Sequence, residues 1–184
     1  MTCIVGFIDD SGDIYMGGDS AGVSGFDIRT CSNPKVFING EFIMGYTSSF
    51  RMGQLLQYSF SPPKYISELH GDIHKYMCTE FVNSLRQCLS NGGYARNDSG
   101  EESGGFFLVG FKGRLFEIQS DFQVFECSEP YNSVGCGESF ALGSLWQNNA
   151  VYGENKVKEA LKCAEYFSAG VRSPFTILKL PKEA

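Results

Sequence analysis

The sequence of 184 residues predicts an α+β fold in which two stacked sheets carry helices on both outer faces. Two observations lead to this prediction. Short apolar runs bounded by tight turns, typical of antiparallel strands, alternate along the chain with pairs of stretches that have helical periodicity. The composition, 42% hydrophobic and 20% charged, is that of a globular protein, and we expect a single domain over residues 1–184.

Strand signals dominate the first quarter of the chain. Four strands are expected, over residues 3–8, 13–18, 35–38 and 41–46. The first two are joined by a polar turn over residues 9–12, and the last two by Asn39-Gly40, the preferred dipeptide of a two-residue hairpin turn. Each pair is therefore expected to be a hairpin. Residues 19–25 between the hairpins are small and polar, which favours a loop.

Helical spacing follows over residues 48–60 and over residues 70–90. Ser48 or Ser49 can cap the first of these helices, and a pair of prolines stops it. Residues 91–105 are mostly Gly, Ser, Asn and acidic side chains, so a flexible loop is expected there.

The second half of the chain repeats the order of strands followed by helices. A three-stranded meander, two helices and a last strand are expected over residues 106–111, 114–119, 122–126, 138–149, 154–168 and 175–180. Groups of antiparallel strands separated by pairs of helices predict two stacked sheets with helices on both outer faces.

The composition also limits the partners. A formal charge of −6 and a pI near 4.9 argue against nucleic acid or an anionic membrane surface as a partner. No apolar run approaches the roughly 18 residues of a membrane span, and no signal peptide is recognisable, so we expect a cytoplasmic protein. The seven cysteines contain no CxxC pair, and His70 and His74 lack further ligands nearby, so neither a disulfide framework, a metal nor a cofactor is expected.

Thr2 is the most informative position for function. Its small side chain allows removal of Met1, after which the same residue would hold a nucleophilic hydroxyl and a basic α-amine. An α-amine has a pKa near 8, and a nearby cation lowers it further. Such an amine can accept the hydroxyl proton at neutral pH.

Five short segments follow one another along the chain in an order that is typical of a known family. They are Thr2-Cys3-Ile4-Val5-Gly6, Gly17-Gly18-Asp19-Ser20, Lys35, Gly45-Tyr46-Thr47-Ser48-Ser49, and residues 133–141 around Gly135-Cys136-Gly137. Together they resemble the proteasome β-subunit family, including the bacterial HslV-type peptidases, which are N-terminal nucleophile hydrolases. The resemblance covers nearly the whole chain and implies the four-layer αββα sandwich of that family.

The resemblance assigns a role to each site residue. Thr2 would be the nucleophile, Lys35 would stabilise negative charge beside its hydroxyl, and Asp19 would pair with Lys35. The backbone N–H of Ser48 would donate to the oxyanion, and Cys136 would support the terminal amine. The substrate-binding residues implied by the resemblance are Tyr46, Val23 and Asn33.

The implied activity is that of a threonine-type endopeptidase in a self-compartmentalising homo-oligomeric ring. Its substrates would be peptides or unfolded proteins, supplied by an ATPase unfoldase. Apolar side chains in the first two helical stretches are expected to form subunit contacts. These side chains are Met52, Leu56, Tyr58, Tyr65, Tyr76 and Phe81.

Two alternatives remain open at this stage. The serines at the expected oxyanion corner replace glycines of the family, Cys136 replaces a serine, and residues 168–173 lack the acidic residue of the proteasome subunits. The first two departures, together with a retained Met1, favour a proteasome-fold assembly protein without hydrolytic activity. In the third, the chain is more similar to the HslV-like and other simple bacterial and phage branches of the family. The other alternative uses Cys3, because Cys3-Ile4-Val5-Gly6 is similar to the start of glutamine amidotransferases.

Overall fold

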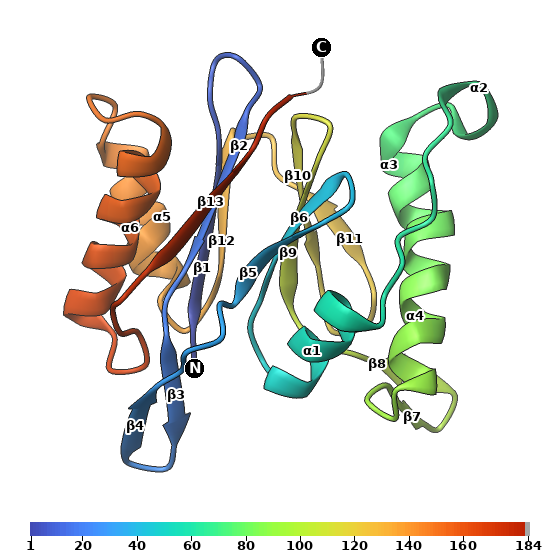
Figure 1. Ribbon diagram of the computed structural model, residues 1–184, viewed down its shortest axis with the longest axis horizontal. Coiled ribbons are helices and arrows are strands. Elements are labelled where there is room, and N and C mark those ends of the chain that lie inside the picture. The colour runs from blue at the N-terminus through green and yellow to red at the C-terminus, as the bar shows by residue number, and fades with distance from the viewer. Residues whose placement is uncertain (183–184) are drawn as a thin grey trace.

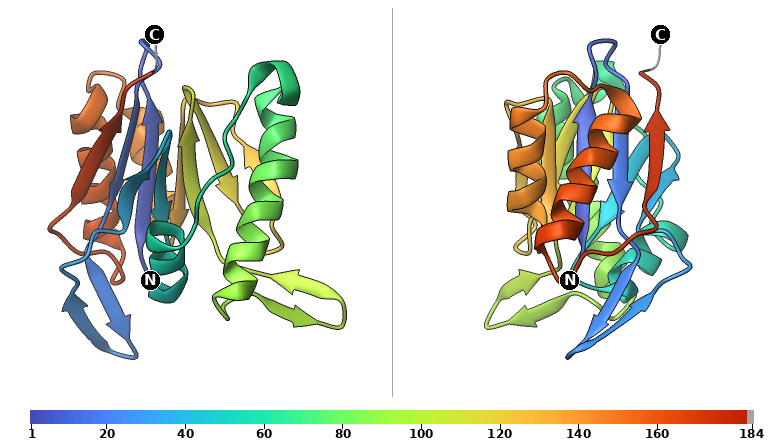
Figure 2. Two further views of the ribbon diagram at one scale, coloured as in Figure 1. Left: turned by 45° about the vertical axis from the view of Figure 1, so that its right-hand side comes forward. Right: turned by 90° about the vertical axis from the view of Figure 1, so that its left-hand side faces the viewer.

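The computed structural model describes residues 1–182 and has four layers (Figure 1). Two antiparallel sheets lie face to face in the centre, and helices cover the outer face of each (Figure 2). The predicted αββα sandwich is therefore confirmed.

The first sheet has the strand order β12-β1-β2-β13, and the second has the order β11-β10-β9-β6-β5. The strands of the first sheet are β1 (Cys3–Ile8), β2 (Ile14–Gly18), β12 (Tyr131–Gly135) and β13 (Thr176–Leu180). Those of the second are β5 (Val36–Asn39), β6 (Phe42–Tyr46), β9 (Phe107–Phe111), β10 (Arg114–Ile118) and β11 (Val124–Glu126). Both predicted hairpins and the meander are present.

The first sheet is covered by two helices, α5 (Glu138–Gln147) and α6 (Gly153–Phe167). The second is covered by α1 (Phe50–Tyr58), α3 (Ile73–Tyr76), a π-helical turn (Met77–Phe81) and α4 (Val82–Asn91). The short helix α2 (Ser67–His70) lies at one end of this layer (Figure 1). Within residues 1–182, no helix combines the length and apolar character that crossing a bilayer requires.

The side chains of the central core, between the two sheets, are closely packed near the start of β1. Its buried side chains are Ile4, Ile14, Met16, Val36, Ile43, Leu108, Leu115 and Val134. Two glycines make room for Ile4, because a Cβ on Gly45 would lie 2.5 Å from its Cγ2 and a Cβ on Gly18 would lie 2.8 Å from its Cδ1. Both glycines belong to segments that carry the resemblance described above. The close packing around β1 explains why these two positions have no side chain.

Two predictions about local structure are wrong, and one strand was missed. The loop expected over residues 19–25 contains β3 (Ala21–Ser24), which pairs with β4 (Asp27–Thr30). The flexible loop expected over residues 91–105 contains a second hairpin, β7 (Arg96–Asp98) with β8 (Glu101–Ser103). Strand β12 was not predicted at all. Both hairpins project from the same end of the sandwich as the N-terminus (Figure 2). Their strands are only three or four residues long, too short for a clear alternation of apolar and polar residues.

The helix expected over residues 70–90 is also interrupted. Gly71 ends α2 with φ of 66°, and a π-helical turn separates α3 from α4, so His70 and His74 lie in different helices.

The apolar side chains assigned to subunit contacts are mostly part of the core between the second sheet and its helices. Met52, Leu56, Tyr76 and Phe81 are buried there, Tyr65 is half-buried, and only Tyr58 is largely exposed. That argument for subunit contacts is therefore wrong for these side chains.

Candidate active site

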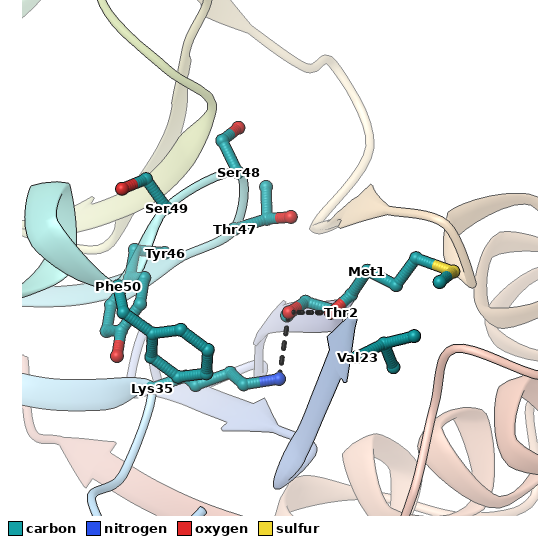
Figure 3. A pocket seen from close by; sticks show the side chains of 9 residues that line it. All are labelled: Met1, Thr2, Val23, Lys35, Tyr46, Thr47, Ser48, Ser49 and Phe50. Carbon is teal, nitrogen blue, oxygen red and sulfur yellow. Dashed lines mark hydrogen bonds between the residues drawn. The ribbon is translucent and has the colours of Figure 1, made fainter. Parts of the chain in front are cut away.

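The ammonium group of Lys35 lies beside the hydroxyl of Thr2. Its Nζ donates a hydrogen bond to Thr2 Oγ1 at 2.8 Å (Figure 3). It also donates to Asp19 Oδ1 at 2.9 Å and to the carbonyl oxygen of Ala21 at 2.7 Å. Three acceptors satisfy all three protons of the ammonium. Lys35 and Asp19 are each only 2% exposed, so the pair is fully removed from water. A buried cation held in this way stabilises negative charge on the Thr2 oxygen.

Asp19 fixes this arrangement to the backbone. Its Oδ1 also accepts the N–H of Cys3 at 3.0 Å, and its Oδ2 accepts the N–H groups of Ala21 at 2.7 Å and Arg172 at 3.3 Å. A carboxylate with four donors stays in one orientation, and it holds the end of β2 against the start of β1. Asp19 therefore positions both Lys35 and the backbone that carries Thr2.

Thr2 lies at the open end of β1 and is itself only 5% exposed. Its hydroxyl donates a hydrogen bond to the carbonyl oxygen of the preceding residue, Met1, at 2.5 Å. Gly135 at the end of β12 approaches closely from the other side. At its φ of 106°, a Cβ would lie 2.2 Å from the carbonyl oxygen of Thr2, so only glycine fits this position.

The corner between β6 and α1 forms the rim of the site. Ser49 is the N-cap of α1, and its hydroxyl accepts the N–H groups of Arg51 and Met52 at 3.1 and 3.4 Å. Ser48 adopts φ of 66°, and its hydroxyl accepts the N–H of Phe106 at 3.1 Å. Within residues 1–182 the Ser48 N–H has no hydrogen-bond partner, which leaves it available to a ligand.

These groups surround one pocket of about 110 Å³. It is lined by Met1, Thr2, Val23, Lys35, Tyr46, Thr47, Ser48, Ser49 and Phe50 (Figure 3). The structure thus brings Val23 and Tyr46 to the pocket, as the resemblance implied. It does not bring Asn33, which lies in the exposed turn before β5 and contributes nothing to the lining. Burial raises the pKa of Tyr46 to about 12, so its phenol stays neutral at physiological pH.

Cys136 reaches the backbone of Thr2 rather than its side chain. The thiol donates to the carbonyl oxygen of Thr2 at 3.4 Å, and the hydroxyl of Ser168 lies 3.5 Å from the sulfur. Cys136 is exposed and lies outside the lining of the pocket. Ser168 was missed by the sequence analysis, because it follows the end of α6 without any local motif.

Cys3 faces the opposite side of the first sheet. Its side chain is fully buried among residues of α5 and α6, and burial raises the pKa of its thiol to about 12. A thiol buried behind the sheet is inaccessible to a substrate, so this arrangement does not favour the alternative based on Cys3.

We expect Cys3→Ala to leave peptide turnover within about twofold of the wild type, because the thiol lies behind the sheet. The lost sulfur should lower the free energy of unfolding by about 1 kcal/mol. Steady-state rates with a fluorogenic peptide and urea denaturation measure the two effects. A Cys3→Ala protein that folds but has lost its turnover would contradict this assignment.

Solved structures with the same four-layer architecture show to which class of fold the chain belongs. The chain aligns over 99% of its length with 99% of Thiobacillus denitrificans BPH (TM-score 0.81, 19% identity), and over 100% of its length with 100% of BPH in complex with epoxomicin (TM-score 0.79, 18% identity). It aligns over 97% of its length with 98% of HslV from Trypanosoma brucei (TM-score 0.67, 17% identity). No family model and no curated protein sequence matches the chain.

The fold is therefore that of the proteasome β-subunit and HslV-type proteins, the N-terminal nucleophile hydrolase fold. At these identities the likeness concerns the fold, and the chemistry has to be argued from the site itself.

Proposed function

We propose that the protein is a threonine-type endopeptidase in which Thr2, after removal of Met1, acts as the N-terminal nucleophile. The observation that carries this proposal is the 2.8 Å hydrogen bond from the buried Lys35 ammonium to the Thr2 hydroxyl, with Asp19 holding the lysine. A paired, desolvated cation at a hydroxyl is expensive to maintain for structure alone.

The reaction follows from this geometry. The freed α-amine of Thr2 accepts the proton as Oγ1 attacks the carbonyl carbon of a peptide bond. The resulting oxyanion accepts a hydrogen bond from the N–H of Ser48, which has no partner in residues 1–182. The C–N bond then breaks, the amine returns the proton to the leaving nitrogen, and an ester remains on Thr2. Water, deprotonated by the same amine, releases the acid product and restores the hydroxyl.

The same proposal includes a homo-oligomeric, proteasome-like ring in the cytoplasm, fed with unfolded chains by an ATPase unfoldase. Exposed aromatic residues support self-association, although they are not those expected from the sequence. Phe140 and Phe167 stack at 5.3 Å on the outer face of α5 and α6, beside Tyr166, which is 83% exposed. Light scattering of the purified protein should therefore give a multiple of 20.3 kDa. A constant monomer mass across concentrations contradicts the ring.

Intact-mass measurement followed by peptide hydrolysis tests the chemistry. The mass decides whether Met1 has been removed, and turnover of a fluorogenic peptide is then measured on protein with a verified Thr2 N-terminus. Epoxomicin, which is bound in one structure of the Thiobacillus denitrificans BPH, is a compound to add in parallel. Turnover that depends on the free Thr2 N-terminus is the expected result.

A proteasome-fold protein that assembles without hydrolysing peptides is the second candidate. Cys136, a weaker hydrogen-bond donor than a serine, and the strained Ser48 at the corner favour it. This candidate replaces the first if protein with a verified Thr2 N-terminus turns over no peptide, even with an ATPase partner supplied.

A further inference from the structure

The short helix α2 (Ser67–His70) is attached to the rest of the fold by few contacts. None of its side chains is buried, and its N-cap, Ile66, makes no side-chain hydrogen bond. The imidazole of His70 makes the attachment, because its Nδ1 accepts the backbone N–H of Ile66 at 2.8 Å. The same ring packs against the rings of Tyr65 and Tyr76, whose centroids are 5.7 and 5.2 Å away. A segment with so little burial can open locally at a low cost in free energy.

The hydrogen bond between His70 and Ile66 requires a neutral imidazole. Nδ1 can accept an N–H only while it carries no proton, so the ring holds its single proton on Nε2. In the imidazolium both nitrogens are donors, and neither can accept, whichever way the ring is turned. Protonation of His70 therefore breaks this bond. Histidine is the side chain whose charge ordinarily changes between about pH 5 and pH 8.

The surroundings of His70 hold no second acceptor for the ring of α2 to fall back on. The titratable and charged groups there are Glu68 on α2 itself, Tyr65 before it, Lys75 and Tyr76 on α3, and Glu80 on the π-helical turn. Both tyrosine hydroxyls already donate to backbone carbonyl oxygens, and burial raises the pKa of Tyr76, so its phenol stays neutral. Lys75 and Glu80 have opposite charges and line one cavity of about 310 Å³ beside the imidazole. Within residues 1–182, the bond to Ile66 is the only hydrogen bond of this ring.

The other of the two histidines responds to acid in the opposite sense. His74 lies on α3, and its Nδ1 is 3.4 Å from a carboxylate oxygen of Glu126, without a hydrogen-bond partner among residues 1–182. A proton on this nitrogen adds a charge-assisted attraction to Glu126. That carboxylate is held in place by Arg114, through two hydrogen bonds of 2.5 Å. Acid therefore strengthens the attachment of α3 to β11, and it weakens only that of α2.

We propose that α2 is an acid-released latch, in which protonation of His70 detaches residues 66–70 and uncovers the ring of Tyr76. Tyr76 is only 1% exposed while the latch is closed, and its ring belongs to an aromatic cluster with Tyr65 and Phe111. The latch lies at the end of the sandwich away from the N-terminus (Figure 1). It is therefore separate from the candidate active site and does not depend on peptide hydrolysis.

Hydrogen–deuterium exchange of the full chain, followed by mass spectrometry at about pH 7.5 and about pH 5.5, tests the latch. After correction for the intrinsic effect of pH on exchange, peptides over residues 64–72 should lose protection by about fivefold at the lower pH, the loss expected for one hydrogen bond. Peptides of α6 should keep their protection. His70→Ala should show low protection of residues 64–72 at both pH values, because it has no acceptor to lose. His70 is not a core residue, so the variant should fold.

His74→Ala is the matched control, since it removes the other histidine and leaves the contact between His70 and Ile66 in place. It should keep the wild-type response over residues 64–72. Equal protection of this segment at both pH values in the wild type overturns the proposal. So does a His70→Ala protein that keeps the response, or a His74→Ala protein that loses it. A loss of protection that extends to α6 is general acid unfolding, and it overturns the latch as well.

Discussion

Replacing Thr2 with alanine will lower peptide hydrolysis by roughly 10⁴-fold or more, the loss typical of removing an enzyme's nucleophile. The change removes one hydroxyl that is 2.8 Å from the Lys35 ammonium and leaves the other two acceptors of that ammonium in place. Stability should therefore fall by only about 1 kcal/mol. Fluorogenic turnover and urea denaturation of the two proteins, each with its N-terminus verified by mass, measure these effects.

Thr2→Ser is the control for this experiment, because it keeps the hydroxyl and the α-amine and loses only a methyl group. It should retain measurable turnover. Full activity of a folded Thr2→Ala protein would exclude the threonine mechanism, whatever the behaviour of Thr2→Ser.

The second large effect is expected for Lys35→Ala, which should remove activity and also destabilise the protein. Asp19 would be left as a buried carboxylate without its cation, and breaking a buried pair in this way costs about 3–5 kcal/mol. The midpoint of urea denaturation should shift clearly downward. Turnover should fall to the level of Thr2→Ala, since the hydroxyl loses the cation that stabilises its negative charge.

Two further variants separate charge from packing at this position. Lys35→Met keeps most of the buried stem without the ammonium, so it should be as inactive as Lys35→Ala. Lys158→Ala removes an exposed lysine from α6 and should change neither activity nor stability. A folded Lys35→Met protein with wild-type turnover would show that the ammonium has no part in the reaction.

The sequence was sufficient for the layers and for the buried site, because both depend on strong local signals. Strand β1 has the predicted bounds. The predicted hairpin of β5 and β6 is present, but its two-residue turn is Gly40-Glu41, because Asn39 is the last residue of β5 and pairs with Phe42. Thr2, Asp19 and Lys35 meet because β1, β2 and β5 all end or begin at one end of the sandwich. Their resemblance to the proteasome β-subunit family is what identified these segments as a set.

Other features depend on contacts that spacing does not reveal. Strand β12 contains buried Asn132 and Ser133, whose side chains are satisfied by Glu117 and by the carbonyl oxygen of Ile4. Such polar residues look like a loop in the sequence. Phe50 looks like one more apolar residue of an amphipathic helix, and its orientation toward the pocket follows only from the cap at Ser49.

The four donors around the Asp19 carboxylate also determine when the site can exist during biosynthesis. Three of them come from the first 35 residues, but the fourth is the N–H of Arg172, 153 positions further along the chain. The neighbouring Ser20 likewise donates to the carbonyl oxygen of Arg172. Because a ribosome makes the N-terminus first, Thr2 leaves it long before its surroundings are complete. A growing chain therefore carries an incomplete site until synthesis has passed residue 172.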